Sequence, residues 1–222
     1  MGQREKRMQR FWVQEKSLTI LLIILAVHIF IIVPIGQKTV VAKIIFLVFY
    51  ISLLSAGMFL LIKHTVLRTV MIVVLGGLML LGADIFFQSD SLEIVDNFVL
   101  VLYSILLGWV VLLRTFSDGP ITIHRIQGAV VVYLLISLVF ACLYHSIYLI
   151  HGEEAFKGLS SADRKEFMYF SLTTLTTVGY GDISSAVASG RSLSNLEALV
   201  GQLYPAILIA RLVSMEFESS KK

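Results

Sequence analysis

Residues 169–182 read YFSLTTLTTVGYGD, and this stretch decides the fold because two glycines, Gly179 and Gly181, alternate with larger residues at its end. In a regular strand, successive carbonyl groups point to opposite sides. They point to one side only if left-handed residues alternate with ordinary ones, and glycine adopts the left-handed conformation at little cost. The pattern therefore predicts a main chain that presents its carbonyl oxygens in one direction, with Val178 and Tyr180 pointing away.

Apolar segments flank this stretch on both sides, at residues 126–150 and 190–215. About 20 apolar residues in a helix cross a bilayer, so each segment is long enough to do so. The amphipathic residues 164–176 between them are too few to cross. Asp163 and Glu166 have the spacing of a capping pair at the start of a helix. We therefore expect a short helix that enters the membrane and returns.

Four more apolar segments precede this unit, at residues 17–36, 39–62, 69–87 and 94–113. Hydrophobic side chains make up 57% of the 222 residues and charged ones 15%, whereas soluble domains have about 45–50% and about 25%. This composition excludes a soluble enzyme and a nucleic-acid-binding chain. Cys142 is the only cysteine, so no disulfide can form within the chain. We predict an all-α integral membrane protein with six transmembrane helices.

The distribution of basic residues predicts the orientation. Most of the 18 Lys and Arg residues lie in residues 1–16 or in segments that six crossings would place on the same side of the membrane. The loop 88–93, on the opposite side, has two acids and no base. Because basic residues are enriched in cytoplasmic loops, we expect a protein of the cell membrane with both chain ends in the cytoplasm.

With its flanking spans and short helix, the sequence TVGYGD at residues 177–182 resembles the selectivity filter of the tetrameric potassium channels. The resemblance covers about residues 126–215, and TVGYG is a known potassium-filter sequence. It implies a pore domain with an outer helix, a re-entrant pore helix, a filter and an inner helix. Because each chain has one filter, the implied unit is a homotetramer that conducts K⁺ passively.

The resemblance also assigns the ion-binding residues. Their carbonyl groups would replace the hydration shell of the ion. The implied filter residues are Thr177, Val178, Gly179, Tyr180 and Gly181, with K⁺ held at the first four.

Other residues are expected to support this filter. Tyr169 and Phe170 occupy the position of an aromatic pair that surrounds the filter in the family, and Asp182 that of an acid that holds the outer mouth. Glu197 either faces the central cavity or lies behind the short helix, where it would hydrogen-bond a threonine. Thr173 is the candidate for that threonine.

The last span carries the expected features of an inner helix. Gly201 lies where many members of the family have a hinge glycine, and Pro205 should bend the helix because it lacks an N–H group. Gln202, Pro205 and Ile209 share one face by their spacing, so they are the candidates for the lining of the cavity.

We divide the chain into a basic cytoplasmic segment (1–16), a four-helix membrane domain (17–125), the pore domain (126–215) and a short cytoplasmic tail (216–222). The four-helix domain resembles a degenerate voltage-sensor-like domain. Voltage sensing needs about 3–4 gating charges on the fourth helix, where this chain has only Arg114. We therefore expect weak voltage gating or none.

Charged residues and histidines near the outer membrane boundary leave alternatives open. Lys43, Asp84 and Asp96 form either a sensing or ion-coordinating cluster or an ion pair that holds the helices together. His145 and His151 flank the outer end of the fifth span. They either let external acid act on the pore or are solvated or interfacial side chains.

Two other classes of function compete with a conducting channel. A non-conducting auxiliary subunit could use the pore domain only to co-assemble with another potassium channel, although the intact filter argues against it. An enzyme or a carrier is disfavoured because the sequence has no nucleophile elbow, Walker loop, HExxH motif or inverted repeat. We expect no catalysis and no cofactor. The expected partners are copies of the chain, membrane lipids and K⁺, without nucleic acid.

Overall fold

The computed structural model describes residues 17–35, 48, 90–116 and 122–219. Apart from residue 48, the sequence-predicted spans 39–62 and 69–87, which contain Lys43 and Asp84, lie outside these residues.

The described chain is helical apart from the segments around residues 156–163 and 176–187. Residues 17–27 form an α-helix that continues as η1 (His28–Ile32) and α2 (Val33–Ile35). The other long helices are α6 (Asp90–Thr115), α7 (Ile123–His151) and α9 (Ala188–Ser219), and α8 (Arg164–Leu175) is short. The 3₁₀ turn η2 (Gly152–Ala155) follows α7, and the strands β1 (Phe156–Lys157) and β2 (Ser184–Ser185) pair antiparallel.

Among the described residues, four helical segments are long and apolar enough to cross a membrane. They are Ser17–Ile35, Glu93–Thr115, Ile123–Ala155 and Ala188–Met215. These segments agree with the first, fourth, fifth and sixth predicted spans to within a few residues. Helix α8 has 12 residues, so at a rise of about 1.5 Å per residue it is too short to cross a hydrocarbon core of about 30 Å.

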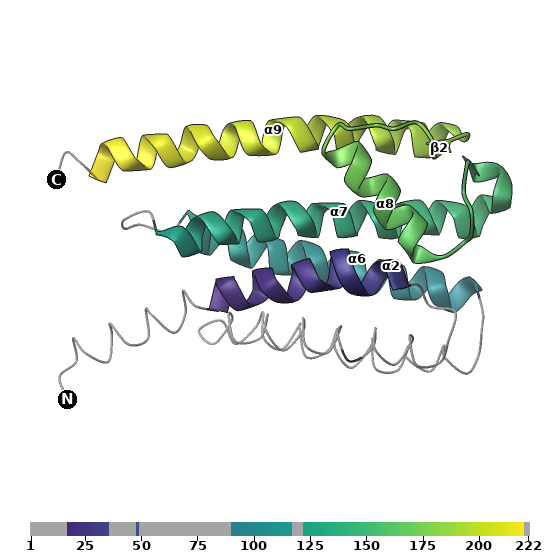
Figure 1. Ribbon diagram of the computed structural model, residues 1–222, viewed down its shortest axis with the longest axis horizontal. Helices are drawn as coiled ribbons and strands as arrows, with labels where there is room; N and C mark the ends of the chain where they lie inside the picture. The colour runs from purple at the N-terminus through teal and green to yellow at the C-terminus, as the bar shows by residue number, and fades with distance from the viewer. Residues whose placement is uncertain (1–16, 36–47, 49–89, 117–121, 220–222) are drawn as a thin grey trace.

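Helix α7 is the centre of the assembly, because α6, α8 and α9 all pack against it. The long helices lie side by side, and α8 lies obliquely between α7 and α9 near one end of the bundle (Figure 1). The β1–β2 pairing joins the chain before α8 to the chain after it. Helix α8 and the residues that follow it are therefore held between two membrane-length helices.

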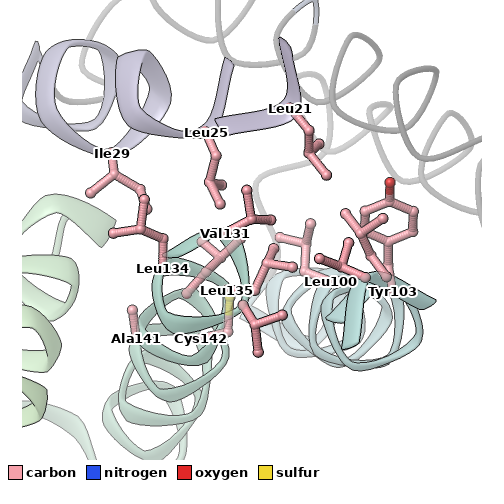
Figure 2. Close-up of a cluster of buried hydrophobic side chains, with 14 of the residues drawn as sticks. Leu21, Leu25, Ile29, Leu100, Tyr103, Val131, Leu134, Leu135, Ala141 and Cys142 are labelled. Carbon is pink, nitrogen blue, oxygen red and sulfur yellow. The ribbon is translucent and has the colours of Figure 1, made fainter. Parts of the chain in front are cut away.

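The main hydrophobic core joins the first helix, α6 and α7. Leu21, Leu25 and Ile29 of the first helix point toward Val131 and Leu135 of α7 (Figure 2). Side chains of α6 close the same cluster. The core therefore runs across the predicted domain boundary at residue 125, and the first helix and α6 pack directly on α7 of the same chain.

Aromatic rings fill a second core between α7, β1 and α8. Phe156 packs edge-on against Tyr144, Phe167 and Phe170, with ring centroids 5.5–5.9 Å apart. Such edge-to-face contacts are favourable beyond the apolar area that they bury. Through Phe167 and Phe170, this cluster packs α8 against α7.

Helix α9 is largely uncovered within the single chain. Only 6% of its most apolar segment is buried, against 61% for α7. Its exposed side chains include Leu196, Leu199, Leu203, Ile207 and Ile209. An apolar helix of this length is available to face lipid or another protein chain.

Candidate functional site

The residues that follow α8 fold back against its last turn. The carbonyl oxygen of Thr173 accepts hydrogen bonds from the backbone N–H groups of Val178 (2.9 Å) and Gly179 (3.1 Å), and Thr174 accepts one from Thr177 (3.0 Å). These bonds satisfy carbonyl groups that a helix end leaves without intrahelical partners. The start of the glycine segment is therefore attached to α8 by its main chain.

The backbone of this segment alternates in handedness. The φ angles are +59° at Thr177, +55° at Gly179 and +79° at Gly181, whereas Val178 and Tyr180 are not left-handed. Thr177 is the only described non-glycine residue with a positive φ. Left-handed residues at every second position turn successive carbonyl groups toward one side, which is the main-chain pattern that the sequence predicts.

Residues 176–182 are exposed in the single chain. The side chains of Val178 and Tyr180 are 53% and 72% exposed, although both are largely apolar. No other part of the described chain covers this segment. A closed oxygen cage would need further copies of this segment.

Tyr169 connects α8 to the end of this segment. Its Oη donates a hydrogen bond of 2.7 Å to Oδ2 of Asp182, and its ring stacks parallel to that of Tyr180 at 6.5 Å. The hydrogen bond to the carboxylate raises the pKa of Tyr169 to about 12. The same bond holds the pKa of Asp182 below its usual range. Asp182 also accepts the N–H of Ile183 at 3.0 Å.

Phe170 does not share this position. It is buried between Tyr144 (ring centroids 4.8 Å apart) and Phe156, on the side of α8 that faces α7. Within the single chain Phe170 therefore packs on the side of α7 and Tyr169 on the side of residues 180–182, whereas the filter that the pair is expected to surround stays a prediction. The physical reason is that consecutive helix residues point about 100° apart.

The start of α8 also differs in detail from the expected capping pair. Asp163 is the N-cap residue, but its side chain makes no cap hydrogen bond to the helix. It accepts instead from Ser161, and Glu166 accepts from Ser160 Oγ at 2.6 Å. The start of the helix was predicted correctly. The carboxylates of Asp163 and Glu166, however, accept hydrogen bonds from serines of the preceding loop.

A polar cluster holds α8 against α6 and α7 near this end of the bundle. Arg164 of α8 donates to Asp96 of α6 at 2.7 Å. His145 of α7 is buried beside Phe167 of α8. Its Nδ1 lies 3.1 Å from Nδ2 of Asn97, and its Nε2 lies 3.6 Å from Oε2 of Glu93.

Asp96 thus pairs across helices, as the ion-pair interpretation requires, although its expected neighbours Lys43 and Asp84 lie outside the described residues. His145 is not solvated, which corrects one of the two alternatives for this residue. His151 is exposed.

Glu197 is buried behind α8, the second of its two predicted positions. Its partners are not Thr173, whose hydroxyl donates to the Phe170 carbonyl (3.0 Å), but Ser171 of α8 and Tyr144 of α7, at 2.5 and 2.6 Å. Sequence reasoning missed both partners. The available signal was a hydroxyl side chain on each of the two segments that were expected to adjoin the last span, Tyr144 on the fifth span and Ser171 on the short helix.

The remaining inner-helix candidates divide into two groups. Gly201 is buried, and a Cβ atom there would collide with the carbonyl oxygen of Leu175 at the end of α8. Gln202 and Ile209 are exposed and Pro205 is half-buried, on the side of α9 that the chain does not cover. Helix α9 continues through Pro205.

The fold is thus that of a helical membrane protein in which a short helix and the glycine-containing segment after it are held between two spans. Residues 128–218 match the sequence profile of a family described as ion channel. Protein LctB from Bacillus caldotenax is 31% identical over 128 residues, which cover 52% of this chain and 92% of LctB. No solved structure matches the chain. The chain belongs to the ion channel family.

Proposed function

We propose that this chain forms a homotetrameric channel that conducts K⁺ passively and selectively. The observation that carries the proposal is the alternation of left-handed residues at Thr177, Gly179 and Gly181 in the sequence TVGYG. A row of carbonyl oxygens on one side of each chain, repeated four times around an axis, would replace the water around a K⁺ ion. Asp182 and Tyr169 would support the outer end of this filter.

The uncovered surfaces of the single chain favour several copies. Residues 176–182 and most of the apolar face of α9 lie on the exterior. Closed rotational symmetry would bring these surfaces from each copy around one axis. Gln202, Pro205 and Ile209 of α9 would then line the cavity below the filter.

Helix α6 offers little for voltage to act on. Helix α6 has a single basic residue, Arg114, in its last turn. Strong voltage dependence needs about 3–4 gating charges in each subunit. We therefore propose a conductance that varies little with membrane potential through α6.

The test is made on the purified 222-residue chain. Light scattering in detergent should give a protein mass of four times 24.8 kDa. Reconstituted in planar bilayers with K⁺ on one side and Na⁺ on the other, the protein should show a reversal potential close to that of K⁺. Protein-free bilayers are the control. A tetramer that carries no current, or one that passes Na⁺ equally well, would contradict the proposal.

A further inference from the structure

The interior of the helix bundle contains the carboxyl group of Glu197, whose role the proposed filter does not explain. Glu197 lies within the membrane-length segment of α9, and its exposed fraction is 0%. Burying a carboxyl group in an apolar environment is costly unless hydrogen bonds compensate for the lost water. A buried ionisable side chain in a membrane-length helix therefore indicates a functional role.

The partners of Glu197 come from two other helices. Ser171 Oγ of α8 donates to Oε1 at 2.5 Å, and Tyr144 Oη of α7 donates to Oε2 at 2.6 Å. Ser171 Oγ also lies 2.8 Å from the carbonyl oxygen of Ser137 in α7. Tyr144 and Ser171 are buried as well. The carboxyl group of Glu197 is therefore the point at which α7, α8 and α9 are joined by side-chain hydrogen bonds.

The same face of α9 supports the end of α8. Gly201, one turn after Glu197, lies directly against the carbonyl group of Leu175, which also accepts a hydrogen bond of 3.1 Å from Tyr133 of α7. Between Ser171 and Leu175 lies Thr173, whose carbonyl oxygen holds the N–H groups of Val178 and Gly179. Displacement of α8 along α9 would therefore displace the row of carbonyl groups.

We infer that Glu197 is a positioning residue for ion selectivity. Through Ser171 and Tyr144 it fixes the depth and rotation of α8, and thereby the spacing of the carbonyl groups at residues 177–181. Its role is geometric, so a neutral side chain of the same shape can replace it. The inference rests on the proposed function, because it concerns the selectivity of the same filter.

The decisive experiment compares Glu197→Ala with Glu197→Gln in planar bilayers with K⁺ and Na⁺ on opposite sides. The amide of Gln can accept from Ser171 and donate to Tyr144, whose hydroxyl acts as donor or acceptor. Glu197→Gln should therefore keep the permeability ratio of the wild type. Glu197→Ala removes both hydrogen bonds and should lower the K⁺-to-Na⁺ permeability ratio by about tenfold.

Glu154→Ala is the matched control, because Glu154 is exposed in η2 and its loss should leave the ratio unchanged. Unchanged selectivity in Glu197→Ala would overturn the inference. An equal loss in Glu197→Gln would also overturn it, because it would assign the effect to charge rather than to position. A wild-type tetramer without K⁺ selectivity would instead contradict the proposed function itself.

Ser171→Ala and Tyr144→Phe keep the test decisive if Glu197→Ala does not assemble. Each removes one hydrogen bond to Glu197 and leaves the carboxyl group in place. Assembled tetramers of both variants should show a smaller loss of selectivity, about threefold. Wild-type selectivity in both would overturn the inference.

Discussion

Tyr169 donates a 2.7 Å hydrogen bond from its Oη to Oδ2 of Asp182, and this bond joins α8 to the residue that directly follows the glycine segment. Both side chains are exposed, so the bond responds to the pH of the surrounding solution. Each partner shifts the pKa of the other: Asp182 titrates below its usual range and Tyr169 near 12.

The pH range over which this bond joins α8 to Asp182 follows from the two pKa shifts. A lowered pKa of Asp182 means that its contribution is present above the ordinary carboxyl value of 3.8 and is lost as the pH falls through the lower value in the folded protein. The raised pKa of Tyr169 means that its contribution is complete below 10 and is lost as the pH rises through about 12. We expect ion flux to be insensitive to this bond between about pH 4 and pH 10.

Tyr169→Phe tests this expectation, because it removes the donor and should return the pKa of Asp182 toward its ordinary value. The acid midpoint of ion flux in proteoliposomes, measured as a function of external pH, should then move upward. Asp182→Asn should remove this titration altogether. An acid midpoint that is the same in Tyr169→Phe and in the wild type would show that another group is responsible.

The packing of α9 against α8 is tested at Gly201, with Gly108 of α6 as the control position. A Cβ atom at Gly201 would collide with the Leu175 carbonyl, whereas one at Gly108 of α6 would meet Leu135 Cδ1 at an ordinary 3.9 Å. Gly201→Ala should lower the free energy of unfolding by about 1–3 kcal/mol. Gly108→Ala should be neutral or stabilising by up to about 1 kcal/mol, because alanine favours the helix. Unfolding in mixed detergent, followed by circular dichroism, measures both.

Local sequence rules predict the features that depend on one residue type. Gly179 and Gly181 are left-handed because they lack a Cβ atom, and the four described spans follow from the lengths of the apolar segments. Thr177 is different. An L-residue in the left-handed conformation is strained, and the surrounding fold alone decides where such strain is tolerated.

Features that depend on packing between helices could not be predicted in this way. Glu197 is joined to Ser171 and Tyr144, which are 26 and 53 residues away in the sequence, so their proximity exists only in the folded bundle. The burial of His145 also depends on neighbouring elements, namely Asn97 of α6 and Phe167 of α8. A histidine near the predicted end of a span gives no sign of either contact.

The left-handed conformation at Gly179 can be tested without a change in packing. A Cβ atom there would have no neighbour within 4 Å in the single chain, but φ is +55°. Gly179→Ala should therefore act through backbone strain of about 1–2 kcal/mol. We expect tetramers to assemble while K⁺ flux is lost, with Gly108→Ala again as the helical control. Normal flux in Gly179→Ala would argue against a left-handed residue at this position.

The ion pair between Arg164 and Asp96 makes a prediction about the coupling of α8 to α6. The two side chains are 17% and 23% exposed and lie 2.7 Å apart, so water screens them only in part. Asp96→Asn or Arg164→Gln alone removes one charge of this partly buried ion pair. Each should lower the free energy of unfolding by about 2 kcal/mol.

The double variant Asp96→Asn with Arg164→Gln removes both charges, so it should be less destabilised than the sum of the single variants by at least about 1 kcal/mol. Lys157→Gln, at an exposed position of β1, controls for the loss of a positive charge and should change stability by less than about 0.5 kcal/mol. Unfolding of all four variants in mixed detergent completes the cycle. Strict additivity would mean that the interaction between the two charges contributes nothing to stability.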